Sequence, residues 1–166
     1  LFSGNRLGNS FAFRWSVLVH MKVTFVTRNY VYGGNLSTII EEIQKQGVKM
    51  KVISVPTNLG VNIVGLVTWF SDCDLVHVNG SWMGAFLRTN KPIVATVHTT
   101  ARGEAKYNSS WLYKVGFWFE DKTLGKADAI ICVSKSIAEE MKDRSNIFVI
   151  PHSLPQFQNT EYGFQK

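Results

Sequence analysis

The stretch Lys22–Gly47 constrains the fold more than any other part of the chain, because it predicts a buried strand, a glycine turn and a helix in succession. Residues 23–27 are β-branched except for Phe25, and neither face of this run is charged, which is typical of a strand covered on both sides. Gly33 and Gly34 then allow a tight backbone turn with no side chain above the next helix. A helix N-terminus in this position points its amide N–H groups and its dipole at an anion.

The helix after the glycine turn is expected to begin at Asn35, which can cap it, and to end at Gly47. Between these residues, apolar side chains recur at the i, i+3, i+4, i+7 spacing of a helix with one apolar face. The residues on that face are Leu36, Ile39, Ile40 and Ile43.

Composition favours one folded domain, since 45% of the 166 residues are hydrophobic and 18% are charged. The two cysteines, Cys73 and Cys132, fit a reduced intracellular protein rather than a disulfide framework. No C-x-x-C motif occurs and the histidines are widely spaced, so we expect no metal site. No apolar stretch reaches the ~18 residues of a membrane-spanning helix, and we expect a cytoplasmic protein, with peripheral attachment to the inner face of the membrane as the alternative.

The net charge of +6 comes from lysines and arginines that are scattered singly, with no basic run and no aromatic-basic repeat. This pattern does not indicate a nucleic-acid partner. A mild basic excess suits an anionic substrate or an anionic membrane surface equally well.

Three segments differ in character along the chain. Residues 1–20 lack the apolar region and cleavage site of a signal peptide, and Met21 stands directly before the first strand, so we interpret 1–20 as a leader or appended segment outside the fold. Residues 21–153 are expected to form one Rossmann-like domain. Residues 154–166 show no periodicity and are interpreted as the start of a linker or tail.

Short runs rich in Val and Ile alternate with helix-like segments, which predicts a doubly wound, mainly parallel α/β sheet of about six or seven strands with helices on both faces. Right-handed crossovers favour the strand order 3-2-1-4-5-6. We also expect a polar loop at 99–108 and a capping box, Ser136–Glu139, that starts a helix. The other expected strands are 48–55, 74–78, 93–98, 128–133 and 146–150, and the other expected helices are 59–70, 81–88 and 109–124.

The main functional prediction concerns the carboxyl ends of the first and fourth strands, because this strand order reverses direction there and open α/β sheets bind ligands at such a point. The first strand brings Gly33 and Gly34 to this point, and the fourth brings His98. Taken singly, the glycines are better explained as a tight turn and the histidine as a strand-end residue. Together they favour a site in which a phosphate on the helix N-terminus faces a histidine able to donate a hydrogen bond.

Other nucleotide sites are disfavoured. A dinucleotide site expects G-x-G-x-x-G and an acidic residue about 20 positions further on, whereas only Gly-Gly is present and Ile53, Ser54 and Val55 end the second strand. Neither a P-loop nor a G-x-S-x-G nucleophile elbow occurs. An NAD- or FAD-dependent oxidoreductase is therefore a weak hypothesis, and we expect no tightly bound cofactor.

Five motifs occur in order between Met21 and Ser153: MKVTFVTRNYVYGGN, DLVHVNG, PIVATVHTT, ADAIICVSKSIAEEM and NIFVIPHS. Together they resemble the N-terminal, acceptor-side domain of family 4 glycosyltransferases of GT-B architecture. The resemblance implies retaining transfer of a sugar from a nucleotide-sugar donor to a glycan or lipid acceptor. It also implies a second GT-B domain, in cis or in trans, which holds most of the donor and whose motifs are not among these 166 residues.

The resemblance also implies roles for individual residues. His98, in the T-V-H-T motif, would contact the transferred sugar and orient or polarise it rather than attack it. The donor diphosphate would lie on Gly33, Gly34 and Asn35. The acceptor would be received by Arg28, Asn29, Tyr30 and Asn79, and Thr99, Arg102 and Ser134 are further candidates, of which Ser134 more often positions the helix.

Two questions stay open at this point. Residues 150–155 depart from the I-P-N-G-V-D that the family usually shows, and a non-catalytic module that binds a sugar phosphate, a lipid or a partner chain is the alternative function. The aromatic segment 111–119 is interpreted either as core plus a contact with the second domain or as a membrane attachment. In the membrane interpretation, the lysines near anionic headgroups are Lys106, Lys114, Lys122 and Lys126.

Overall fold

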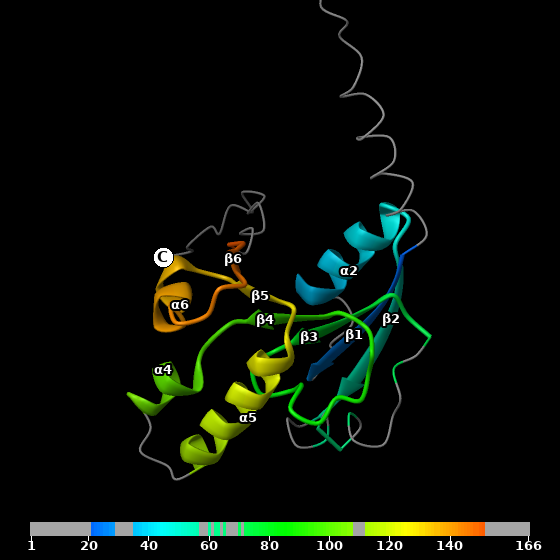
Figure 1. Cartoon of the computed structure of the whole chain (residues 1–166). Helices are drawn as coiled ribbons and strands as arrows, with labels where there is room; N and C mark the ends of the chain where they lie inside the picture. The colour runs from blue at the N-terminus through cyan, green and yellow to red at the C-terminus, as the bar shows by residue number, and fades with distance from the viewer. Residues whose placement is uncertain are drawn as a thin grey trace, which may run out of the picture.

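The structure of the chain is a computed structural model, and it describes residues 21–28, 35–56, 60, 62–63, 65, 70, 72–107 and 112–151 (Figure 1). In this part, six strands form one sheet in which every neighbouring pair is parallel. The strands are β1 (Lys22–Arg28), β2 (Lys49–Val55), β3 (Leu75–Asn79), β4 (Ile93–Val97), β5 (Ala129–Cys132) and β6 (Ile147–Val149). The predicted α/β class and parallel sheet are confirmed.

The predicted strand order is wrong. The sheet runs β2-β1-β3-β4-β5-β6, so β1 lies between β2 and β3 and the direction reverses beside β3 rather than β4. The sequence of β2 explains the difference, because Lys49 and Lys51 are exposed and leave this strand suited to the edge of the sheet. β3 has no such charges, and its Val76 and Val78 are fully buried inside the sheet.

Helices cover both faces of the sheet, with α2 on one side and α5 on the other (Figure 1). Gly47 adopts a φ of 87° just after α2, so the predicted glycine stop is confirmed. Within α2, however, Ile40 is buried whereas Ile39 is 39% exposed, and the small Ser37 is buried instead. The helices are α2 (Asn35–Lys45), α4 (Ala101–Ala105), α5 (Leu112–Lys126) and α6 (Lys135–Glu140).

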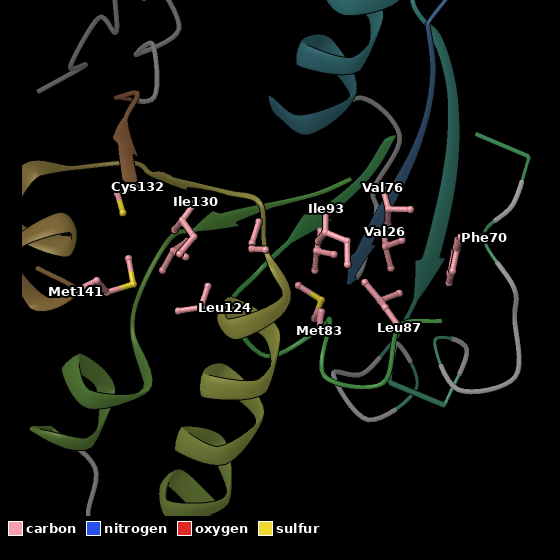
Figure 2. Close-up of a cluster of buried hydrophobic side chains, with 14 of the residues drawn as sticks. Val26, Phe70, Val76, Met83, Leu87, Ile93, Leu124, Ile130, Cys132 and Met141 are labelled. Carbon is pink, nitrogen blue, oxygen red and sulfur yellow. The ribbon is translucent and has the colours of Figure 1, made fainter. Parts of the chain in front are cut away.

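The main hydrophobic core lies between the sheet and α5 (Figure 2). Leu124 points from α5 toward the strands, and Met83 and Leu87 fill the space beside it. Each fully buried valine contributes about 1.5–3 kcal/mol relative to an exposed one. The strand residues with no exposed surface are Val26, Val76, Val78, Ala95, Val97, Ile130 and Cys132.

The predicted helix at 81–88 is absent, and the segment forms turns. Partners on α5 hold its backbone in this form. The Gly84 N–H donates to Thr123 Oγ1 at 3.0 Å, and Lys126 Nζ donates to the Ala85 carbonyl at 2.6 Å. Because these partners lie about 40 residues further along the chain, no local pattern announces them.

Two helix starts also differ from prediction. The expected loop 99–108 contains α4, because Thr100 Oγ1 accepts a hydrogen bond from the Gly103 N–H at 2.8 Å and caps a single helical turn. α6 is capped by Ser134, whose Oγ accepts from the Ile137 N–H at 3.3 Å, and not by the predicted box at Ser136. The predicted helix 59–70 lies mostly outside the described residues.

Candidate functional site

The candidate site lies where β1, β3 and β4 end, on the face of the sheet that includes Phe25 and His77. Phe25 pairs with His77 in the register of β1 and β3, so Thr27 and Asn79, two residues further on, share the same face. Asn79 Nδ2 donates to Thr27 Oγ1 at 3.2 Å, and Asn79 Oδ1 lies 2.7 Å from His98 Nε2. This chain of hydrogen bonds connects three strand ends and leads from a buried hydroxyl to an exposed imidazole.

A second polar pair lies one layer deeper in the sheet. His77 Nε2 lies 2.7 Å from Thr96 Oγ1, and the His77 ring packs against Phe25 with a centroid distance of 4.8 Å. Burial, with a smaller contribution from the nearby His98, lowers the pKa of His77 to about 4. His77 is therefore neutral near pH 7, and it packs within the sheet between Phe25 and Thr96.

The turn after β3 brings a second element to the site. Gly80 adopts a φ of 144°, in the region that favours glycine, and an added Cβ would lie 2.1 Å from Met83 Cε. Beyond this turn, Ser81 Oγ donates to the Thr99 carbonyl at 3.4 Å. This hydrogen bond connects Thr99, which follows His98, to Ser81, which follows Gly80.

Glu120 on α5 anchors the same loop from below. Its Oε2 accepts the Ala101 N–H at 2.7 Å, and the side chain is nearly buried. Burial raises the pKa of Glu120, and the hydrogen bond from the Ala101 N–H offsets part of that increase. Nothing in the sequence distinguished this carboxylate, because only the structure shows which side of α5 faces inward.

Glu140 at the end of α6 holds both ends of α4. Its carboxylate accepts from the Thr100 hydroxyl and from Lys106 Nζ, the latter at 2.8 Å. These two hydrogen bonds, that of Lys106 first, lower the pKa of Glu140. Glu140 holds Thr100 and Glu120 holds Ala101, so the two residues that follow Thr99 are both fixed, close to His98.

The predicted site residues fare differently in the structure. His98 and Asn79 come together, and exposed Thr99 is next to them. The prediction that strands 1 and 4 are neighbours is wrong, because β3 lies between them and Asn79 supplies the connection. Arg28 ends β1 with its side chain exposed, Ser134 caps α6, and Arg102 is exposed in α4.

The glycine turn itself is not described. Asn29, Tyr30, Gly33 and Gly34 lie outside the described residues, so their contact with a ligand stays a prediction. Asn35 is the first residue of α2.

Thr27, Ser81, Thr100 and Glu120 were missed by sequence reasoning. Thr27 offered one signal, since it ends a strand on the same alternation as Phe25 and precedes the polar loop. The others act through partners on distant elements. In the part of the chain that the structure covers, no group of three or more His, Cys, Asp or Glu side chains could hold a metal ion.

The amino ends of the strands present a different surface, with a groove of about 490 Å³ between β4 and the end of α5. The polar atoms at its rim have structural partners. Asp128 Oδ2 accepts the Ile93 N–H at 2.8 Å, and Lys126 Nζ donates to two carbonyls of the 81–88 turn. Burial lowers the pKa of Lys126. These charged groups of the groove therefore hold the 81–88 turn, and the candidate site lies at the opposite edge of the sheet.

α5 itself is less uniformly apolar in space than in sequence. Glu120, Thr123 and Leu124 face inward, whereas Val115 is 41% and Trp118 is 46% exposed. The Lys122 ammonium lies 5.9 Å from the centre of a Trp118 ring. None of the helices that the structure describes is long and apolar enough to cross a bilayer.

A comparison with models of protein families finds a match to this chain. The model of the family described as Glycosyltransferase Family 4 matches residues 59–154, which is more than half of the chain. The matched range includes Asn79, His98 and Glu120 and the strands from β3 to β6. No curated protein matches the chain.

Proposed function

The chain belongs to glycosyltransferase family 4, and on this premise we propose that it forms the acceptor-side half of a retaining glycosyltransferase with a nucleotide-sugar donor. One observation carries the proposal. The hydrogen-bonded chain from Thr27 through Asn79 holds an exposed His98 at the carboxyl edge of a parallel sheet, where α/β folds bind ligands. The rest of the donor site would lie on a second domain of the GT-B pair.

In the proposed reaction, His98 orients or polarises the transferred sugar through a hydrogen bond. The charge that develops on the leaving diphosphate is stabilised by amide N–H groups at Gly33, Gly34 and Asn35, where α2 begins, and by cations of the second domain. Arg28, which ends β1, and Asn29 and Tyr30, which follow it in the sequence, receive the glycan or lipid acceptor. No cofactor is consumed, because the nucleotide-sugar is itself the activated substrate.

The carboxylates around His98 argue against glycoside hydrolysis. That chemistry needs two carboxyl groups on either side of the scissile bond. Glu120 is bound to the Ala101 N–H beneath the loop, and Glu140 is bound to Thr100 and Lys106. Both carboxylates hold the fold of the loop, and neither is placed to attack a sugar.

A transfer assay tests the proposal. The chain is combined, as a fusion and as a separate polypeptide, with a GT-B donor-binding domain and a panel of labelled nucleotide-sugars, and the anomeric configuration of the product is read by NMR. We expect retention of configuration, and a loss of roughly 10²-fold in rate for His98→Ala, comparable to removal of one preorganised hydrogen-bond partner. The matched control, Lys51→Ala on the edge strand β2, should keep the wild-type rate.

Two outcomes would count against a glycosyltransferase. One is an unchanged rate in His98→Ala. The other is calorimetric binding of a glycan or a sugar phosphate to the chain alone with no transfer in any combination, which would favour the binding-module alternative.

A further inference from the structure

We propose that Asn79 is a positioning residue that fixes the tautomer of His98, with its own amide oriented by Thr27. In this arrangement His98 carries a proton on Nε2 at all times, and Asn79 is not a contact for the acceptor as the family resemblance implied. We call this fixed tautomer of His98, held by Asn79 and Thr27, the lock. Its meaning for catalysis rests on the proposed function, but its existence does not.

The orientation of the Asn79 amide determines the argument. An amide has a donor end and an acceptor end, and the Nδ2 end donates to Thr27 Oγ1 at 3.2 Å. The Thr27 hydroxyl in turn points its proton toward the Arg28 carbonyl, 3.4 Å away, so that its lone pairs are left for Asn79. The amide oxygen therefore faces His98 Nε2, at 2.7 Å.

An amide oxygen accepts hydrogen bonds and cannot donate them, so His98 Nε2 must carry the proton of this contact. A neutral imidazole with its proton on Nε2 has its lone pair on Nδ1. Neutral His98 is consequently a hydrogen-bond acceptor at Nδ1, suited to a sugar hydroxyl that donates. The Nε2–H group stays committed to Asn79, and His98 can donate to a ligand only as the imidazolium.

The anchor of this lock is rigid. Thr27 is 1% exposed and lies in β1, which has β2 on one side and β3 on the other. Its branched side chain has few rotamers to choose from. Asn79 lies at the end of β3 and pairs in register with Thr96 of β4. The Nδ2 end of the amide is therefore held by β1 and the backbone of Asn79 by β4, so the amide oxygen has a fixed position from which it orients the exposed imidazole.

The neighbouring His77 shows what an unlocked histidine looks like. Its Nε2 contacts the Thr96 hydroxyl, which can either donate or accept. The same kind of distance, 2.7 Å, thus leaves the His77 tautomer undetermined, whereas an amide oxygen determines that of His98.

Long-range ¹H–¹⁵N NMR on the full chain, uniformly labelled and recorded well above the titration of its histidines, tests the lock. In the wild-type protein we expect His98 to show a protonated Nε2 and an unprotonated Nδ1. Asn79→Ala should give a mixture of the two tautomers, and Thr27→Val, which keeps the shape but loses the acceptor, should shift the population in the same direction. The matched control is Thr24→Val, also buried in β1 but on the opposite face, which should leave His98 unchanged.

A conservative variant guards against loss of folding. Asn79→Asp keeps an acceptor at Nε2 and adds a charge that favours the imidazolium, so the midpoint of the His98 titration should rise by about one pH unit. Two results would overturn the proposal: a wild-type His98 protonated on Nδ1, or an Nε2–H form that persists undiminished in a folded Asn79→Ala protein. If the protein transfers sugar but His98 shows no fixed tautomer, only this inference is refuted. If His98 shows the fixed tautomer but no transfer occurs, only the proposed function is refuted.

Discussion

The two edges of the sheet use their polar side chains in opposite ways. At the amino ends of the strands, carboxylates accept backbone N–H groups: Asp74 Oδ2 accepts that of Lys22 and Asp128 Oδ2 that of Ile93, each at 2.8 Å. At the carboxyl ends, one series of side chains bonds to other side chains, from Thr27 to Asn79 to His98. The first arrangement provides acceptors for backbone N–H groups and has no further role in the described structure. The second places a titratable group, the His98 imidazole, in solvent with a defined orientation.

The support beneath the carboxyl edge gives the largest expected effect on stability. Glu120→Ala leaves the buried Ala101 N–H without its acceptor, and we expect the free energy of unfolding in urea to fall by about 3 kcal/mol. The matched control is Asp121→Ala, which removes the neighbouring carboxylate. That group is 77% exposed and paired with Arg144, so its loss should cost at most about 1 kcal/mol. Equal losses in the two variants would mean that Glu120 does not hold the loop.

The amino edge predicts a loss of stability without a loss of function. Asp128→Ala removes a charged acceptor from the first N–H of β4 and should lower the free energy of unfolding by about 2 kcal/mol. Asp128→Asn keeps an oxygen acceptor and should recover most of that loss. The rate of sugar transfer per folded molecule should stay at the wild-type value in both variants. A reduced rate would show that the amino edge also serves the site.

The sequence predicted those features of the two edges that depend on local composition, and it did not predict those that depend on contacts between distant residues. The strands were predicted almost to the residue, because burial on two faces leaves a run such as Val23–Thr27 with β-branched and aromatic residues alone. The strand order was not, since it depends on the exposed Lys49 and Lys51 keeping β2 at the edge.

The candidate site follows the same rule. His98 was identified because the carboxyl ends of the strands in an α/β sheet share one edge, whereas Asn79 was named only because the family resemblance implied a contact with the acceptor. Thr27 and Glu120 were not, because their importance comes from atoms 52 and 19 residues away in the chain. A local sequence pattern predicts the conformation of a segment. It does not predict which side chain in that segment will accept a hydrogen bond from a distant residue.

The caps of α4 and α6 sharpen the comparison on a smaller scale. Thr100→Ala removes the acceptor of the Gly103 N–H at 2.8 Å and should cost about 1 kcal/mol. Ser134→Ala removes a longer contact, 3.3 Å to the Ile137 N–H, and should cost about 0.5 kcal/mol. Because Thr100 follows the site loop, only Thr100→Ala should also broaden the His98 resonances. Broadening in Ser134→Ala instead would place the support of the site on α6.

The pH dependence of stability depends on Glu120. Burial raises the pKa of Glu120 in the folded protein above its ordinary value of 4.5, so the folded state holds this proton more tightly than the unfolded state. Its contribution to stability is fully present below pH 4.5 and is lost as the pH rises through the folded-state pKa. Glu120→Gln should remove this part of the dependence, measured as urea midpoints across that interval. An unchanged pH profile would assign the dependence to another group.

The smallest effect is expected on the outer side of α5. Its exposed stripe consists of Val115 and Trp118, and the Lys122 ammonium already lies over the Trp118 ring. An interfacial helix needs a broad apolar face, whereas the inward side of α5 is committed to the core through Leu124. We therefore expect the stripe to contact a second domain, and we expect equal, low sedimentation of the protein with anionic and neutral vesicles. If the protein instead sediments more with anionic vesicles, and Lys122→Ala reduces this sedimentation, the helix contacts a membrane. Attraction between the exposed lysine and anionic headgroups is expected for a membrane and not for a second domain.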